Sequence, residues 1–153
     1  MCSSCVLSEF FHIIPKLTAG ETMKFHAICE NHLYSKAYSK GKRAVTASVA
    51  VYLLPDYKAE ALKRANPMKK RINRIGLTVS KKLGGAVTRN RVKRILREGI
   101  RSVMQTNGLR TGFLIVVAAR EKARVQTSTQ IAAELSVAFE KLGILLDTKK
   151  AKP

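Results

Sequence analysis

The chain has 153 residues, of which 46% are hydrophobic, enough for one globular domain that folds without disulfides or metal. Lysine and arginine total 29 against 10 acidic residues, a formal net charge of +19. Such an excess is typical of proteins that bind a polyanion, most often nucleic acid, and it argues against a metabolic enzyme for small neutral substrates. Because no apolar stretch approaches the roughly eighteen residues of a membrane span, we expect no membrane partner.

The two ends of the chain differ in character from its middle. Residues 1–22 contain one lysine against two glutamates, and Met23 offers a second plausible start. We therefore expect 1–22 to be a disordered or dispensable extension, without the features of a secretory signal. Residues 23–146 would form the domain, and 147–153 a disordered basic tail.

Three cysteines, Cys2, Cys5 and Cys29, all lie in the first thirty residues. An odd, clustered set does not resemble a disulfide framework, so we expect a reducing, cytoplasmic location. The spacing of Cys2 and Cys5 could serve one half of a zinc site, but the later histidines and Cys29 lack the regular spacing of a second ligand pair. We favour an incidental pair and expect no metal bound by the protein itself.

The first half of the domain predicts a helix and a strand. Residues 30–40 have a helical pattern, with Tyr34 and Tyr38 four residues apart on one face. Residues 44–54 alternate apolar and polar side chains, which predicts one strand with a face in the core and Tyr52 on the open face.

The second half predicts two further strands and two helices. A long, basic connection over 55–73 leads to a strand at 75–81. After two glycines, residues 88–106 predict an amphipathic helix, and the apolar run at 112–119 predicts a strand covered on both faces. A capping box opens a last helix over 127–142. This order predicts an α/β two-layer sandwich in which helices pack on one small sheet.

The helix predicted over 88–106 has two different faces. Its apolar face consists of Val92, Ile95, Leu96, Ile100 and Val103, and its basic face of Asn90, Lys93, Arg94, Arg97 and Arg101. Arg89 and Arg91 fall in its first turn, where the helix dipole favours acidic side chains. The segment 69–101 has a net charge of +11, from five Lys and seven Arg against one Glu.

Most runs of charge are simply solvated surface faces. Here, however, like charges repel along the helix with few acids to offset them, and two arginines occupy its unfavourable end. Free backbone N–H groups, the helix dipole and guanidinium groups all favour an anion, and guanidinium binds phosphate bidentately. We therefore interpret the basic face as a polyanion-binding surface.

The segment 76–98, GLTVSKKLGGAVTRNRVKRILRE, resembles the signature of the bacterial ribonuclease P protein subunit. The resemblance extends over about 31–142 and implies a ribonucleoprotein endoribonuclease, a hydrolase whose RNA subunit removes the 5′ leader of precursor tRNA. It also implies a fold shared with the second domain of a small-subunit ribosomal protein. In that fold the strand–helix–strand crossover over 75–119 is left-handed, whereas the sequence alone favours the common right hand.

The same resemblance implies where RNA binds. The catalytic RNA would contact the helix through Arg89, Asn90, Arg91, Lys93, Arg94, Arg97 and Arg101. A cleft between the first helix and the sheet would hold the single-stranded leader, with Tyr34, Tyr38, Tyr52, Lys81 and Lys82 as its contacts. The alternative for the tyrosines is that they only cover the sheet. One protein monomer would bind one RNA, and Mg²⁺ would be held mainly by that RNA.

The distribution of acidic residues agrees with catalysis by the RNA rather than by the protein. Metal-dependent hydrolysis of a phosphodiester needs clustered carboxylates. Between residues 36 and 101 only Asp56, Glu60 and Glu98 are acidic, and no two are adjacent. We therefore expect no catalytic residue in the protein and disfavour a protein-only nuclease. A structural, ribosome-associated RNA-binding protein without a nuclease role remains the other alternative.

Overall fold

A computed structural model describes residues 26–58, 64 and 73–146 of the chain. The expected extension 1–22, the tail 147–153 and most of the connection 55–73 lie outside these residues. Within the described part, no helix is long and apolar enough to cross a membrane.

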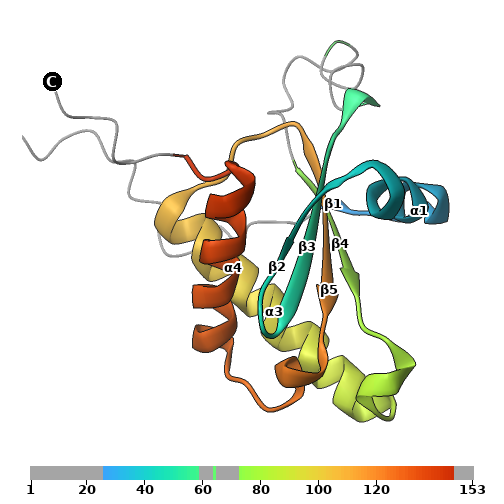
Figure 1. The fold of residues 1–153 in the computed structure, drawn as a ribbon, viewed down its shortest axis with the longest axis vertical. Coiled ribbons are helices and arrows are strands. Elements are labelled where there is room, and N and C mark those ends of the chain that lie inside the picture. Colours follow the sequence, from blue (N-terminus) through green and yellow to red (C-terminus); the bar gives the residue numbers. More distant parts are fainter. Residues whose placement is uncertain (1–25, 59–63, 65–72, 147–153) are drawn as a thin grey trace, which may run out of the picture.

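One five-stranded mixed sheet organises the domain (Figure 1). Its strands, in spatial order, are β1 (His26–Ala27), β4 (Arg74–Thr78), β5 (Phe113–Ala119), β3 (Val49–Pro55) and β2 (Lys42–Val45). β4 runs parallel to both β1 and β5, whereas β3 is antiparallel to β5 and to β2. The small mixed sheet predicted from the sequence is confirmed.

Helices cover both faces of this sheet (Figure 1). The main layer is formed by α3 (Ala86–Asn107) and α4 (Ser128–Leu142), and α1 (Asn31–Lys40) packs on the opposite face. Two short 3₁₀ helices, η1 (Lys81–Leu83) and η2 (Glu121–Arg124), follow β4 and β5. α3 makes the crossover between the parallel strands β4 and β5, as expected, and its left hand stays a prediction.

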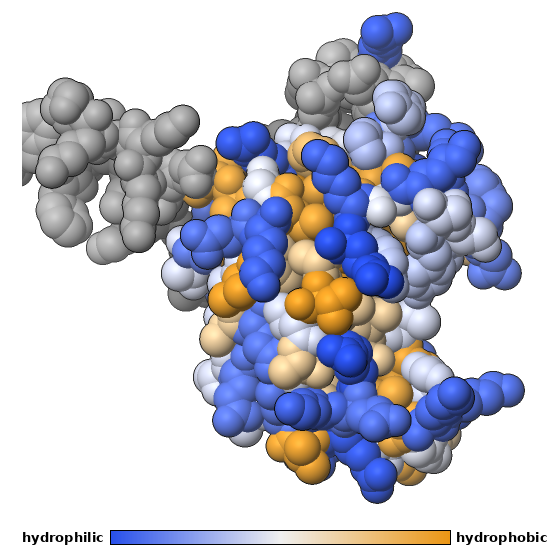
Figure 2. Space-filling view, in the orientation of Figure 1, coloured by the Kyte–Doolittle hydropathy of each residue, from blue (hydrophilic) through white to orange (hydrophobic). Residues whose placement is uncertain are grey.

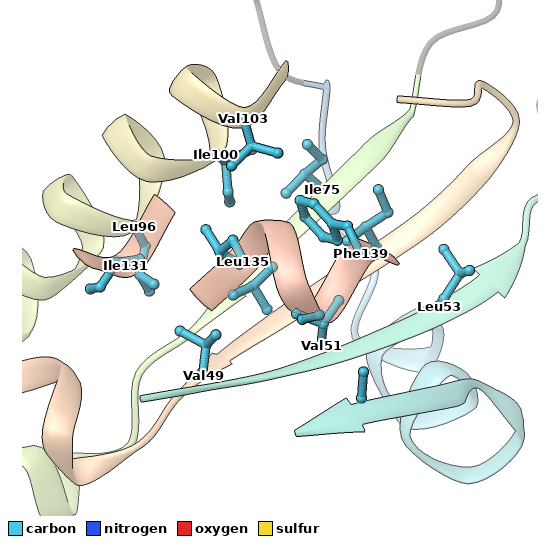
Figure 3. Packing of buried hydrophobic residues seen from close by; sticks show 14 of the residues in the cluster. Val49, Val51, Leu53, Ile75, Leu96, Ile100, Val103, Ile131, Leu135 and Phe139 are labelled. Carbon is cyan, nitrogen blue, oxygen red and sulfur yellow. The ribbon is translucent and has the colours of Figure 1, made fainter. Parts of the chain in front are cut away.

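The main core lies between the sheet and the two long helices, and Figure 3 shows how their side chains meet. Fully or nearly fully buried side chains come from β3 (Val49, Val51, Leu53), from α3 (Val92, Leu96, Ile100, Val103) and from α4 (Ile131, Leu135, Phe139). The predicted apolar face of α3 is therefore confirmed, with Ile95 at its half-buried edge. Gly99 lets α4 approach closely, because a Cβ there would lie 3.1 Å from Ile131 Cγ2.

The single strand predicted over 44–54 is wrong, because the chain reverses within it to form the β2–β3 hairpin. The Thr46 backbone N–H donates to the Val49 carbonyl at 2.8 Å, and the Thr46 hydroxyl donates to the same oxygen at 3.0 Å. Ser48, one of the polar residues of the alternating pattern, is buried in the turn. No glycine or proline marks this turn, and the apolar alternation continues across it, so the sequence pattern concealed it.

The start of α3 also differs from the prediction. β4 ends at Thr78, and the helix begins at Ala86 rather than at residue 88. Gly84 has φ +127°, a conformation that breaks the chain direction after η1 and that a side chain would disfavour. Arg89 is consequently the fourth helical residue and Arg91 lies in the second turn, so the dipole disfavours these cations less than the sequence indicated.

A half-buried carboxylate, that of Glu134, anchors the β2–β3 turn to α4. Glu134 accepts hydrogen bonds from the Ser48 backbone N–H at 2.8 Å, the Ser48 hydroxyl at 2.9 Å and the Gln126 amide at 2.8 Å. Desolvation opposes ionisation of this carboxyl, but the hydrogen bonds from Gln126, Ser48 and Thr46 outweigh it, and the pKa of Glu134 is lowered. The ionised form is therefore the one that stabilises the fold.

This pKa shift has a testable consequence for stability. A carboxyl whose pKa is lower in the folded state adds stability above its ordinary pKa, and that stability is lost as pH falls through the folded-state value. We expect Glu134→Gln to lower the free energy of unfolding at neutral pH, and the gap to wild type to narrow as pH falls below about 4.5. Urea unfolding across this range measures both quantities, and a gap that is independent of pH would contradict the assignment.

Candidate nucleic-acid interface

The predicted basic residues of α3 lie on one side of the helix, away from the core. We name this set the cationic ridge: Arg89, Asn90, Arg91, Lys93, Arg94, Arg97 and Arg101. Most of these side chains are exposed, and Arg89 and Lys93 are half-buried. The apolar face of the same helix is buried against the sheet and α4, so the ridge is directed outward by packing.

The ridge has little internal neutralisation. Among the described residues, the ion pairs within 4 Å join Glu30 to His32 and Lys58, and Asp56 to Arg74, all remote from the ridge in the sequence. Arg101 has an interaction partner within the chain, so the uncompensated cations are those nearer the helix start. These side chains repel one another, and an added anion would relieve that repulsion.

Arg89 also has a hydrogen-bond donor without an acceptor in the described part of the chain. Its Nε atom is buried and has no hydrogen-bond partner among the described residues. A buried donor without an acceptor costs on the order of 1–3 kcal/mol. Arg89 is therefore held against the protein surface, with an unsatisfied donor beside the exposed arginines of the ridge.

The three predicted tyrosines come together on the other face of the sheet, between α1 and the strands. The rings of Tyr38 and Tyr52 meet edge to face, with centroids 4.7 Å apart and planes at 84°. The Tyr38 hydroxyl donates to Thr78 Oγ1 at 2.9 Å. We call Tyr34, Tyr38 and Tyr52 the tyrosine surface; the cleft expected beside α1 stays a prediction.

The members of the tyrosine surface differ in how freely they can meet a ligand. Tyr34 lies against the backbone of Gly76, where a Cβ would come within 2.6 Å of its ring, and its hydroxyl donates to the Ile28 carbonyl at 3.3 Å. Burial raises the pKa of Tyr34, with smaller contributions from Tyr38 and Cys29. Tyr38 is 40% exposed, so it offers the most accessible ring. The covering role therefore fits Tyr34 better than Tyr38.

Sequence reasoning missed two partners of these tyrosines, Gly76 and Thr78. A glycine inside a strand often indicates that another group approaches the backbone closely. Gly76 lies inside the predicted strand, so its position could have indicated the contact with Tyr34. No sequence pattern indicated Thr78, because its contact with Tyr38 joins residues forty positions apart.

Lys81 and Lys82 are both exposed in η1, between the end of β4 and the start of α3. In the described part of the chain, no hydrogen bond or ion pair joins either lysine to Tyr34, Tyr38 or Tyr52. Hydrophilic side chains predominate at the lower right of the molecule, where Figure 1 draws η1 and the start of α3 (Figure 2). The two lysines thus belong to the region that links the tyrosine surface with the cationic ridge.

The acidic residues do not assemble into a metal centre in the described part of the chain, where no three His, Cys, Asp or Glu residues cluster. Asp56 is buried and engaged bidentately by Arg74, with Nε–Oδ2 and Nη2–Oδ1 distances of 2.6 and 2.7 Å. That hydrogen bonding raises the pKa of Arg74. Glu60 and the Cys2–Cys5 pair lie outside the described residues.

Comparison with known proteins agrees with this geometry. The family model for ribonuclease P matches residues 23–143. The ribonuclease P protein component of Clostridium acetobutylicum is 30% identical over 128 residues, 84% of this chain and 98% of that protein. That of Dehalococcoides mccartyi is 52% identical over 63 residues, 41% of this chain and 49% of that protein.

A solved structure shares the fold. The RNase P protein of Staphylococcus aureus is 27% identical in sequence and superposes with a TM-score of 0.61. The match covers 79% of this chain and 98% of that protein. Sequence signature, topology and relatives agree over the same region. The chain therefore belongs to the ribonuclease P protein family, the protein component of a tRNA-processing ribonucleoprotein enzyme whose catalysis is driven by its RNA.

Proposed function

We propose that the cationic ridge docks on the catalytic RNA. The observation that carries this proposal is the row of exposed, uncompensated side chains at Arg91, Arg94 and Arg97, next to the unpartnered Nε of Arg89. Guanidinium groups match the two acceptor oxygens of a phosphate, and such charge-assisted bonds are roughly twice as strong as neutral ones. RNA phosphates would offset the repulsion that the folded protein alone must bear.

The tyrosine surface holds the single-stranded leader of precursor tRNA. The exposed ring of Tyr38, supported by Tyr52 and by the bond to Thr78, is a rigid platform for an unpaired base. Stacking depends on the π face that every base has, so it tolerates many leader sequences. Lys81 and Lys82 contribute charge toward the leader backbone from η1.

The remaining features of the complex follow from these two contacts. The ridge is one surface on one chain, which suits a 1:1 complex of a protein monomer with the RNA. Mg²⁺ belongs mainly to the RNA partner, whose phosphates supply the oxygen ligands that this cation prefers. The exposed, unpaired thiol of Cys29 suits a reducing, cytoplasmic setting.

The experiment that tests this function reconstitutes cleavage of precursor tRNA. We expect the protein alone to leave the substrate intact, and the protein with the host's catalytic RNA and Mg²⁺ to cleave more efficiently than the RNA alone. The readout is the rate of release of the 5′ leader at subsaturating substrate. Cleavage by a clean preparation of the protein alone would overturn the proposal.

The ridge is tested by replacing two of its exposed arginines together, Arg91→Ala and Arg94→Ala. Because neither side chain is in the core, we expect an unchanged fold and weaker binding of the catalytic RNA. Each lost phosphate contact should reduce the slope of log affinity against log salt by about 0.7–0.9. Lys141→Ala, an exposed lysine in the last turn of α4, is the control. A slope equal to that of the control would show that the arginines do not meet phosphate.

The tyrosine surface is tested with Tyr38→Ala and with Tyr57→Ala, a tyrosine that is 75% exposed, as its control. Loss of one stacked base should weaken holoenzyme binding of leader-bearing precursor tRNA by about 1–3 kcal/mol. Affinity for mature tRNA, which lacks a leader, should not change. If both substrates are affected equally, Tyr38 acts on the fold rather than on the leader.

A further inference from the structure

An apolar hollow lies at the end of the sheet where β3 finishes and β5 begins, opposite to η1 and η2, and none of the roles above accounts for it. It has a volume of about 310 Å³, which falls within the range of ligand pockets. Its apolar lining consists of Leu53, Pro55, Phe113, Leu142 and Ile144. Figure 1 shows this end of the sheet near the top, beside the end of α4.

The hollow exists because α4 stops before it covers the end of the sheet. The helix is terminated at Gly143, whose φ of +68° is left-handed. Pro55 and Phe113 are paired at the adjacent ends of β3 and β5. Phe113 and Leu142 pack against the main core but are only half-buried, and Pro55 is exposed. The main core is thus open to water at this end, where a further apolar group would be favourable.

Two lysines add a charge requirement to this apolar surface. Lys40, the last residue of α1, and Lys42, the first of β2, also line the hollow, and both are exposed. None of the described residues that line the hollow is acidic, and no ion pair within 4 Å joins either lysine to another described residue. A complementary occupant therefore carries large apolar side chains next to a carboxylate.

Residues 6–14 of the same chain have this composition. Six of these nine residues are hydrophobic, among them Phe10 and Phe11, and Glu9 directly precedes the two rings. The connection over 55–73 and the tail over 147–153 both have a net positive charge, which the two lysines would repel. Charge complementarity thus favours the N-terminal segment over these other two.

The chain enters the sheet at the same end as the hollow. His26 is paired with Arg74, and Arg74 is paired with Leu114, the residue after Phe113. Two strand spacings, about 10 Å, therefore separate His26 from this part of β5. The chain between Phe11 and His26 spans up to about 50 Å when extended, so its length permits Phe11 to reach the hollow.

We propose that residues 6–14 dock in this hollow, with the ring of Phe10 or Phe11 against its apolar lining and the Glu9 carboxylate at Lys40 and Lys42. The docked segment closes the open end of the main core. It gives a role to a part of the chain whose composition alone indicates a dispensable extension. The inference takes no RNA as partner, so it is tested on the protein by itself and does not depend on the proposed function.

The test uses tryptophan fluorescence, because the chain contains no tryptophan. Phe11→Trp in the full chain provides a single reporter, and Phe10→Trp is measured in parallel because the two rings are adjacent. In at least one variant we expect emission that is blue-shifted relative to the same variant in urea and that acrylamide quenches less. Solvent-like emission from both folded variants would overturn the proposal.

A second set of variants locates the reporter. Pro55→Arg introduces a bulky cation into the hollow at an exposed position, and Pro55→Ala is its control. We expect the blue shift to be lost with Pro55→Arg and kept with Pro55→Ala. Glu9→Lys leaves the described residues unaltered and should also reduce the shift, because it places a cation beside Lys40 and Lys42.

Two outcomes would assign the segment to another place. A blue shift that persists in both Pro55→Arg and Glu9→Lys would show that the ring packs outside this hollow. A blue shift that grows with protein concentration would show that a second copy of the chain supplies the segment. Either result contradicts docking within one chain, and circular dichroism verifies that each variant is folded.

Discussion

The burial of one stripe of α3 is the constraint on which the position of the cationic ridge depends. Leu96 and Ile100 are almost fully buried against the sheet and α4, and Gly99 allows α4 to approach the helix closely. Rotation of α3 about its axis would expose these side chains to water, at about 25 cal/mol for each Å² of apolar area. The helix is therefore locked, and its cations are held outward. The core and the cationic ridge use two faces of the same helix without competing for residues.

This arrangement has an electrostatic cost that the free protein bears. Two acids of the described chain are committed elsewhere: Asp56 holds Arg74, and Glu134 holds the β2–β3 turn. Few remain to offset the ridge, which is consistent with selection for a polyanion rather than for the stability of the isolated chain. In the described part of the chain no three His, Cys, Asp or Glu residues cluster, and metal-dependent hydrolysis of a phosphodiester needs clustered carboxylates.

Structural features that follow from a local sequence pattern could be predicted, and features that depend on contacts between distant residues could not. The apolar and basic faces of α3 follow from helical periodicity, and the capping box of Thr127 and Gln130 is present as expected. The β2–β3 turn escaped prediction because bonds to Glu134, far along the chain, support it in place of a glycine or proline. The start of α3 depends on the positive φ of Gly84, and two adjacent glycines left open which residue would break the chain.

In the candidate site, too, local sequence patterns could be predicted and contacts between distant residues could not. Tyr34 and Tyr38 could be placed on one face because they are four residues apart on a helix, but their unequal exposure depends on Gly76 and Thr78 in a strand beyond the connection.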